Sequence, residues 1–185
     1  MNFNTHSDLQ GKHAFLSPSS YSWVNYTDQK LEARYFAVSA ARRGTDLHAL
    51  AHEAIRLGVK LAKGNQALST YVNDAIGYKM VCEQPLFYSN NCFGTADTIS
   101  FRRGKLRIHD LKTGLIVGSE KQLEVYAALF CLEYGFDPFS IEVELRIYQR
   151  EDIRVFEPFA ETIVEIMNKI IIFDQQIEAI RAADL

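Results

Sequence analysis

The sequence predicts an α/β domain with a mixed central β-sheet flanked by helices. Three runs with β character follow one another between residues 79 and 111, and further strand-like runs follow residue 138. Helical segments precede the first three runs, separate the third run from the fourth, and close the chain. Strands and helices in this order favour a layered α/β fold over an all-helical or all-strand one.

The composition is that of an ordinary globular domain. The 185 residues, 48% of them hydrophobic, fit a single domain over residues 1–185 that buries a core without covalent staples. The net charge of −3 shows no global preference for nucleic acid, so any such affinity requires a local basic patch. Three widely spaced cysteines argue against a disulfide framework, a tetrahedral zinc site and a four-cysteine iron–sulfur cluster.

The chain carries no obvious targeting signal. No apolar run approaches membrane-spanning length, and the first residues lack the pattern of a signal peptide. We therefore expect a soluble cytoplasmic protein that does not enter a membrane. Residues 1–13 are polar, and we expect them to be loose.

Three helices are predicted before the first strand. Ser17 and Pro18 are a good N-cap and first helical residue, and core packing is the preferred role for the aromatic residues that follow, with base stacking as the alternative. Apolar periodicity predicts a second helix from Asp46 to Ala62, with Gly64 as its stop, and a third over about Gln66–Ile76.

The central strands form the next group. Lys79–Tyr88 has strand character, and Pro85 indicates that its pairing is interrupted nearby. Gly94–Phe101 and Lys105–Leu111 flank a tight turn of two arginines and a glycine, which predicts a β-hairpin.

The remaining elements follow the hairpin. Gly114 and Gly118 bound a flexible link into a helix over about Ser119–Tyr134, which stops before Gly135. Alternation over 138–150 predicts a strand with one face on the core and one face toward solvent, paired with a short strand at 153–156. A long amphipathic helix over about 160–182 is expected to pack on the sheet, with an excess of isoleucine that also suits a subunit contact.

Three charged residues of the hairpin are the candidate catalytic group. Asp110 and Lys112 are two residues apart on one strand, so their side chains leave the same face, and hairpin pairing brings Asp97 beside them. Two carboxylates and an ammonium on one patch suit a divalent cation and a phosphate. The plainer alternative is that all three are solvated surface charges.

Four motifs around this group resemble the PD-(D/E)XK nuclease superfamily, and within it the RecB-like branch that includes phage exonucleases. The hairpin carries Gly-x-x-Asp followed by Asp-x-Lys-Thr-Gly, and the order and spacing of the other motifs also match. These are the Leu-Ser-x-Ser-like segment 16–20, the Gly-Thr-x-x-His segment 44–48 and the Gln-x-x-x-Tyr segment 122–126. The resemblance covers about residues 15–148 and implies a restriction-endonuclease-like fold.

The resemblance also implies a ligand set and a mechanism. His48, Asp97, Asp110 and the main-chain carbonyl of Leu111 would hold Mg²⁺ or Mn²⁺, with imidazole favouring Mn²⁺. Lys112 would position or activate the attacking water, completing the catalytic group. The substrate strand would lie on two residues of the next helix, Gln122 and Tyr126.

Three further residues are auxiliary candidates. Members of this branch often carry His-x-x-x-Glu, whereas here the position four residues after His48 is His52 and the glutamate, Glu53, comes one residue late. Members of this branch also commonly have a glutamate on the strand before the first catalytic aspartate, and Glu83 lies at such a position. It would serve as an additional carboxylate ligand or as an orienting group. Equally, it is a solvated strand residue. A two-histidine zinc site at His48 and His52 lacks an obvious third ligand.

The function implied is that of a metal-dependent deoxyribonuclease, an exonuclease on linear double-stranded DNA or its ends with little sequence specificity. Phage-type recombination or DNA processing would be its setting, in the host cytoplasm, as a homo-oligomer or with a single-strand annealing protein as partner. Endonuclease action and RNA substrates remain alternatives. Two rival hypotheses are a catalytically inactive nuclease fold that binds DNA or serves in an assembly, and an unrelated α/β protein.

Overall fold

The computed structural model describes residues 14–62, 66–114 and 118–183. Two compact units are distinguished, residues 1–43 and Gly44–Leu185, and the boundary falls inside helix α1 (Asp28–Leu57). Each unit is described by itself, and a single domain over the whole chain stays a prediction. The predicted loose segment 1–13, the stop at Gly64 and the link 115–117 lie outside the described residues.

The first unit holds a short 3₁₀ helix and the first half of α1. The predicted helix after Ser17 is present as η2 (Pro18–Asn25), but none of its residues is buried, so the expected core role of its aromatic residues is wrong. Tyr21 is exposed, and Trp23 makes a local bond from its indole N–H to the Ser17 carbonyl at 3.0 Å. Trp23 is thus bonded to its own segment, and Tyr21 faces solvent.

Helix α1 differs from its predicted bounds at both ends. It begins 18 residues before the predicted Asp46, and it ends at Leu57 because Gly58 adopts φ +68° and donates its N–H to the Ile55 carbonyl. A glycine tolerates this left-handed conformation without steric cost, so it stops the helix ahead of Ala62. The next helix, α2 (Gln66–Gly77), agrees with the prediction.

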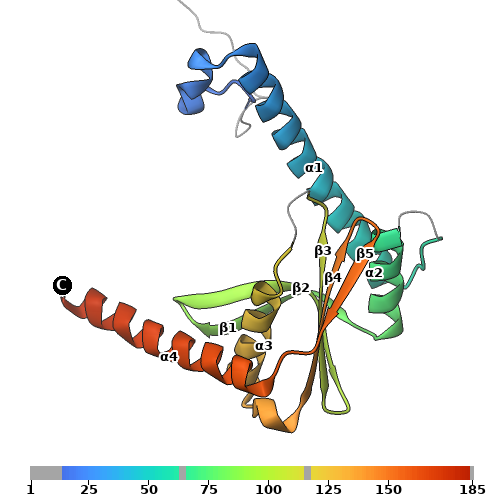
Figure 1. The fold of residues 1–185 in the computed structure, drawn as a ribbon, viewed down its shortest axis with the longest axis vertical. Helices are drawn as coiled ribbons and strands as arrows, with labels where there is room; N and C mark the ends of the chain where they lie inside the picture. The colour runs from blue at the N-terminus through green and yellow to red at the C-terminus, as the bar shows by residue number, and fades with distance from the viewer. Residues whose placement is uncertain (1–13, 63–65, 115–117, 184–185) are drawn as a thin grey trace, which may run out of the picture. The chain divides into compact units, whose positions relative to one another are not determined.

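A five-stranded mixed sheet forms the centre of the second unit (Figure 1). Its strands lie in sequence order: β1 (Val81–Ser89), β2 (Cys92–Arg102), β3 (Lys105–Lys112), β4 (Glu142–Gln149) and β5 (Asp152–Phe156). Neighbouring strands are antiparallel except β3 and β4, which are parallel. The predicted α/β class, a mixed sheet flanked by helices, is confirmed.

The β2–β3 hairpin has the predicted turn. Arg102 pairs with Lys105, and Arg103 and Gly104 between them have φ of +53° and +75°. Two central residues with positive φ match the right-handed twist of the flanking strands, which is why a two-residue loop closes here. Pro85 itself lies on the edge strand β1 and pairs with Thr95 of β2. The predicted interruption lies nearby, where the β1–β2 register shifts between Phe87 and Ser89.

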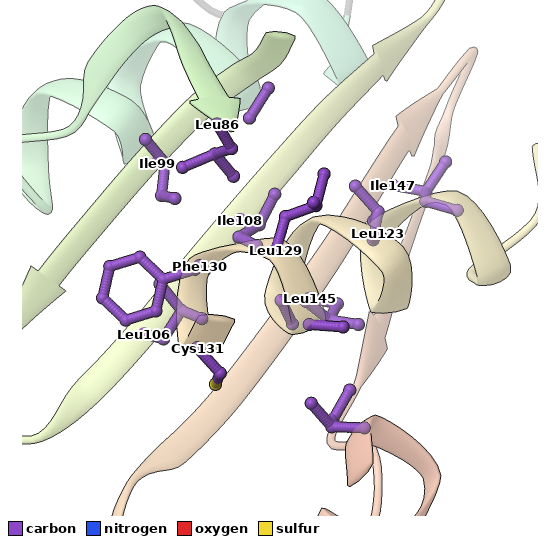
Figure 2. Close-up of a cluster of buried hydrophobic side chains, with 14 residues drawn as sticks. Leu86, Ile99, Leu106, Ile108, Leu123, Leu129, Phe130, Cys131, Leu145 and Ile147 are labelled. Carbon is purple, nitrogen blue, oxygen red and sulfur yellow. The ribbon is translucent and has the colours of Figure 1, made fainter. Parts of the chain in front are cut away.

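The link from β3 to β4 is helix α3 (Lys121–Tyr134), which covers one face of the sheet. It ends where predicted, because Gly135 has φ +70° and donates to the Cys131 carbonyl. Figure 2 shows its apolar side chains packed on those of the strands. Each fully buried leucine or isoleucine in such a cluster contributes about 1.5–3 kcal/mol. The cluster includes Leu86, Ala96, Ile99, Leu106, Ile108, Leu123, Leu129, Leu145, Ile147 and Ile163.

The second face of β4 is not open to solvent, contrary to the prediction. The described strand starts at Glu142, because Pro138–Ser140 forms a 3₁₀ turn, and Glu144 and Tyr148 are buried. Tyr148 and Leu111 pack with α2 and the end of α1 in a second core cluster. Alternation correctly separated the two faces of β4 but did not reveal that helices cover both.

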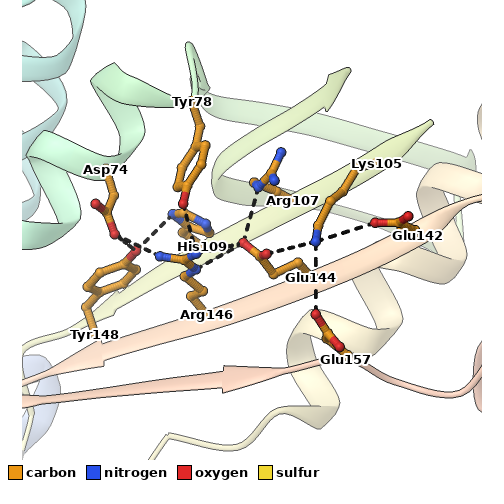
Figure 3. Close-up of polar contacts among 10 residues, drawn as sticks. All are labelled: Asp74, Tyr78, Lys105, Arg107, His109, Glu142, Glu144, Arg146, Tyr148 and Glu157. Carbon is orange, nitrogen blue, oxygen red and sulfur yellow. Dashed lines mark hydrogen bonds and ion pairs between the residues drawn. The ribbon is translucent and has the colours of Figure 1, made fainter. Parts of the chain in front are cut away.

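Charged groups on this face, one of them buried and the others half-buried, are paired with one another (Figure 3). The Arg146 guanidinium donates to Asp74 Oδ2 at 2.9 Å, the Tyr78 hydroxyl at 3.0 Å and Glu144 Oε1 at 3.0 Å. The Tyr148 hydroxyl donates to the same Asp74 oxygen at 2.7 Å. Pairing offsets the desolvation that burial of these groups requires.

The last helix, α4 (Ala160–Ala183), agrees with the predicted bounds but packs mainly on α3 rather than on the sheet. Ile163 is its one buried residue among those described, and the second half of the helix leaves Phe173 and Ile180 exposed. Within the described residues, no helix is long and apolar enough to cross a membrane.

Burial of His109 should make the folded protein less stable in acid, and this effect can be tested. Its fully buried ring lies beside Tyr148, and burial, followed by the charge of Arg146, lowers its pKa from 6.5 to about 3. Between these values the unfolded chain binds a proton that the folded chain does not, so stability falls as the pH falls through this window. We expect roughly 1 kcal/mol of unfolding free energy to be lost between pH 6 and pH 5 through this residue.

Urea unfolding at several pH values tests this contribution. His109→Phe, which keeps an uncharged ring, should flatten the fall of unfolding free energy between pH 7 and pH 5. An equally steep fall in the variant would show that other groups cause it.

Candidate active site

The hairpin register places the two candidate aspartates side by side. Thr98 pairs with His109, which puts Asp97 one step further, across from Asp110. Asp97 Oδ2 accepts the main-chain N–H of Leu111 at 3.2 Å, and His48 Nδ1 lies 3.6 Å from the same oxygen. Asp97 therefore joins β2, β3 and α1 through one carboxylate oxygen.

The backbone departs from a regular ladder beside Asp97. Ala96, Ile99 and Phe101 all pack in the cluster under α3, and the three-residue step from Ala96 to Ile99 breaks the alternation of a strand. On β1, Glu83 lies between the residues paired with Thr98 and Ala96 and has φ +49°. Non-glycine residues in this conformation cost free energy and are concentrated at functional sites.

Asp110 is the most buried acid of the group. Its side chain keeps little exposure, its Oδ1 accepts from Lys112 Nζ at 3.0 Å, and its buried Oδ2 has no hydrogen-bond partner among the described residues. Burial is the largest effect on its pKa, and with the nearby Asp97 charge it raises the pKa above the ordinary value, although Lys112 opposes the shift. A carboxylate oxygen without a donor is costly in such an environment.

Lys112 connects the strand to helix α3. Its ammonium donates to Asp110 Oδ1 and also to Gln122 Oε1 at 2.9 Å. Gln122 lies in the first turn of α3, so the helix presents a polar group to the end of β3. The ammonium is thus held between a carboxylate and an amide.

Tyr126 follows one turn after Gln122 and packs against the glycine of the Gly-x-x-Asp motif. A Cβ added at Gly94 would lie 3.0 Å from Tyr126 Cε1. Any larger side chain would displace the tyrosine, so the requirement for glycine is close approach and not a special φ.

The two histidines of α1 contact different acids. His48 lies against Asp97, whereas His52 Nδ1 is 3.2 Å from Glu83 Oε1, and the two rings are 6.0 Å apart. Gly44 brings this part of the helix close to the end of β3, because a Cβ there would lie 2.5 Å from Thr113 Oγ1. The Gly-Thr-x-x-His and Asp-x-Lys-Thr-Gly motifs therefore meet.

The structure gathers most of the predicted site residues. His48, Asp97, Asp110, Leu111, Lys112 and Gln122 form one connected group, with Tyr126 beside Gly94 and the Glu83–His52 pair as its neighbours. Glu53 is directed elsewhere: both of its carboxylate oxygens bond Arg56, at 2.9 and 2.6 Å, on the exposed side of α1. The roles of these residues stay predictions.

The donor set suits a hard divalent cation. Asp97 and Asp110 offer carboxylate oxygens, and His48 offers an imidazole. Asp110 Oδ2, which bonds none of the residues that the structure describes, is an acceptor that a cation would satisfy. Among the described residues, no three His, Cys, Asp or Glu side chains already surround a common point.

Sequence analysis did not identify Gln149 at the end of β4, although the parallel register pairs it with Lys112. The signal in the sequence that could have indicated it was a polar residue at the end of an alternating strand.

Comparison of the sequence with models of protein families gives no match, and comparison with curated proteins gives none either.

Removing the charge of Asp110 should stabilise the folded protein. In metal-free buffer, Asp110→Asn relieves burial of a charged oxygen beside Asp97 while leaving an acceptor for Lys112, so we expect a gain of about 1 kcal/mol in unfolding free energy. Thermal melting with a chelator present measures it. Destabilisation would show that the carboxylate is better satisfied than its contacts indicate.

The contact of Gly44 with Thr113 predicts that the effect of Gly44→Ala on the unfolding free energy changes sign when Thr113 is replaced by alanine. Gly44→Ala should destabilise the protein, although alanine is normally better than glycine inside a helix by about 1 kcal/mol. In a Thr113→Ala background the clash is removed, and the same change should stabilise. Urea unfolding of the four members of this cycle gives the result, and simple additivity would contradict the contact.

Proposed function

We propose that this protein is a divalent-metal-dependent deoxyribonuclease, acting as an exonuclease on linear DNA with little sequence specificity. The observation that carries the proposal is the buried Asp110 carboxylate beside Asp97. One of its oxygens is bonded to Lys112, and the other has no hydrogen-bond partner in the part of the chain that the structure describes. A fold retains an arrangement this costly where a charged ligand compensates for it. The four motifs of the PD-(D/E)XK resemblance support the same function.

His48, Asp97, Asp110 and the Leu111 carbonyl would hold the ion, Mg²⁺ or Mn²⁺. When bound, such an ion lowers the pKa of a coordinated water and neutralises charge on the phosphate. In the structure, Asp97 Oδ2 already contacts His48 and the Leu111 N–H, which supports these residues as one set.

The protein's own residues supply the rest of the chemistry. The Lys112 ammonium, held by Asp110 and Gln122, would neutralise the phosphate and orient the attacking water. Gln122 and Tyr126 lie on one face of α3 and would seat the substrate backbone. Hydrolysis in this geometry would leave a 5′-phosphate and a 3′-hydroxyl, as the resemblance implies.

The five-stranded mixed sheet is compatible with a restriction-endonuclease-like fold, which belongs to the same proposal. The cytoplasmic setting and a partnership with a single-strand annealing protein are also part of this proposal. For a homo-oligomer, the exposed half of α4 offers an apolar surface, and gel filtration at the mass of one 21.1 kDa chain would exclude it.

The proposal predicts a metal-dependent activity that requires Lys112. We expect 5′-labelled linear duplex DNA to be degraded in Mg²⁺ or Mn²⁺ while covalently closed circles survive. Lys112→Ala and Asp97→Asn should each lower the rate at least about 100-fold, because each removes charge from the site of phosphate stabilisation. Lys169→Ala, at an exposed position of α4, and Glu53→Gln are the matched controls and should cleave normally.

The outcomes separate the hypotheses. Nicking of circles would indicate an endonuclease with the same chemistry. Binding of DNA without cleavage in either metal would favour the inactive nuclease fold, and a chain that binds neither metal nor DNA would favour the unrelated α/β protein.

A further inference from the structure

Gln149 joins the two ends of the link that follows β3. It is the last residue of β4, it pairs in parallel register with Lys112, and it is 8% exposed. Its Nε2 donates to the Gly114 carbonyl at 2.8 Å, and its Oε1 accepts the Gly118 N–H at 3.2 Å. One buried amide therefore holds the main chain on both sides of residues 115–117.

Gly118 in turn lies against the stem of Lys112. A Cβ added to Gly118 would be 3.0 Å from Lys112 Cγ, 3.4 Å from Lys112 Cε and 3.2 Å from Ile147 Cγ2. Arg154 donates to the Gly118 carbonyl at 2.8 Å, so both polar groups of this glycine are bonded to side chains. The backbone at Gly118 forms a fixed wall along the lysine.

This wall matters because a lysine side chain has many rotamers of similar energy. In the observed rotamer the Lys112 ammonium bonds both Asp110 and Gln122, and its four-carbon stem lies along Gly118. Holding a long side chain in one rotamer costs conformational entropy unless the surroundings exclude the others. Packing against Gly118 excludes rotamers on that side.

We infer that Gln149 is a positioning residue: by clamping Gly114 and Gly118, it holds the backbone wall that keeps the Lys112 ammonium between Asp110 and Gln122. The effect on catalysis rests on the proposed nuclease function, whereas the effect on Lys112 itself does not. The side chain of Gln149 acts through Lys112 and is not assigned a contact with substrate.

The test removes both clamp bonds without changing the length of the side chain. In Gln149→Met, NMR spectra of full-length protein with isotope-labelled lysine should show the Lys112 ε-methylene signal more mobile and shifted toward that of a free lysine. Its assignment comes from loss of the signal in Lys112→Arg. In the DNA cleavage assay, kcat should fall about tenfold while KM changes less than twofold.

Asn73 supplies a matched control. Its amide also makes two main-chain bonds to one loop, donating to the Leu61 carbonyl and accepting the Leu61 N–H, each at 3.0 Å. Asn73→Leu likewise removes two main-chain bonds, at a site that does not contact Lys112. It should lower the melting temperature, yet leave the Lys112 signal and kcat unchanged.

The outcomes separate the clamp from general stability and from the proposed function. If Gln149→Met lowers the melting temperature but leaves the Lys112 signal unchanged, the inference is overturned. Should the unmodified protein not cleave DNA, the proposed function fails, and the NMR comparison still decides the clamp. If Gln149→Met does not fold, Gln149→Glu, which keeps only the acceptor for Gly118, should show a smaller release of Lys112, and an unchanged signal there would overturn the clamp.

Discussion

The parallel pairing of β3 with β4 is the constraint on which the rest of the structure depends. A parallel neighbour cannot be reached by a tight turn, so the chain must cross one face of the sheet before β4 begins. Helix α3 makes that crossing, and its first turn consequently lies beside the end of β3. The contact between Lys112 and Gln122 follows directly from this topology. The same pairing brings the end of β4, and with it Gln149, next to Lys112.

Burial on both faces makes the end of β3 a place where charge is expensive. Leu111 packs toward α2, while Asp110 retains little contact with water. The protein offsets this cost only in part, through Lys112 on one oxygen of Asp110. A residual electrostatic cost of this kind opposes folding, and this makes Asp110 a candidate functional residue.

The other charged cluster of the sheet behaves differently. Around Arg146, the charged and hydroxyl groups of Asp74, Tyr78, Glu144 and Tyr148 bond one another (Figure 3). Such a satisfied network stabilises one packing of α2 on the sheet and leaves little for a ligand to add. The contrast with Asp110 distinguishes a structural set of paired charges from a candidate functional one within the same sheet.

Local signals in the sequence determined several features without help from the fold. The turn at Arg103 and Gly104, the stop at Gly135, and the strand and helix periodicities each depend on neighbours within a few residues. The pairing of Asp97 with Asp110 also follows from the hairpin alone. Tertiary structure decided what covers the second face of β4, where α1 begins, and which side chains approach Gly44 and Gly94 closely. It also decided the place of Gln149 beside Lys112. Alternation shows which side chains share a face, but only contacts between segments distant in the chain determine what lies against that face.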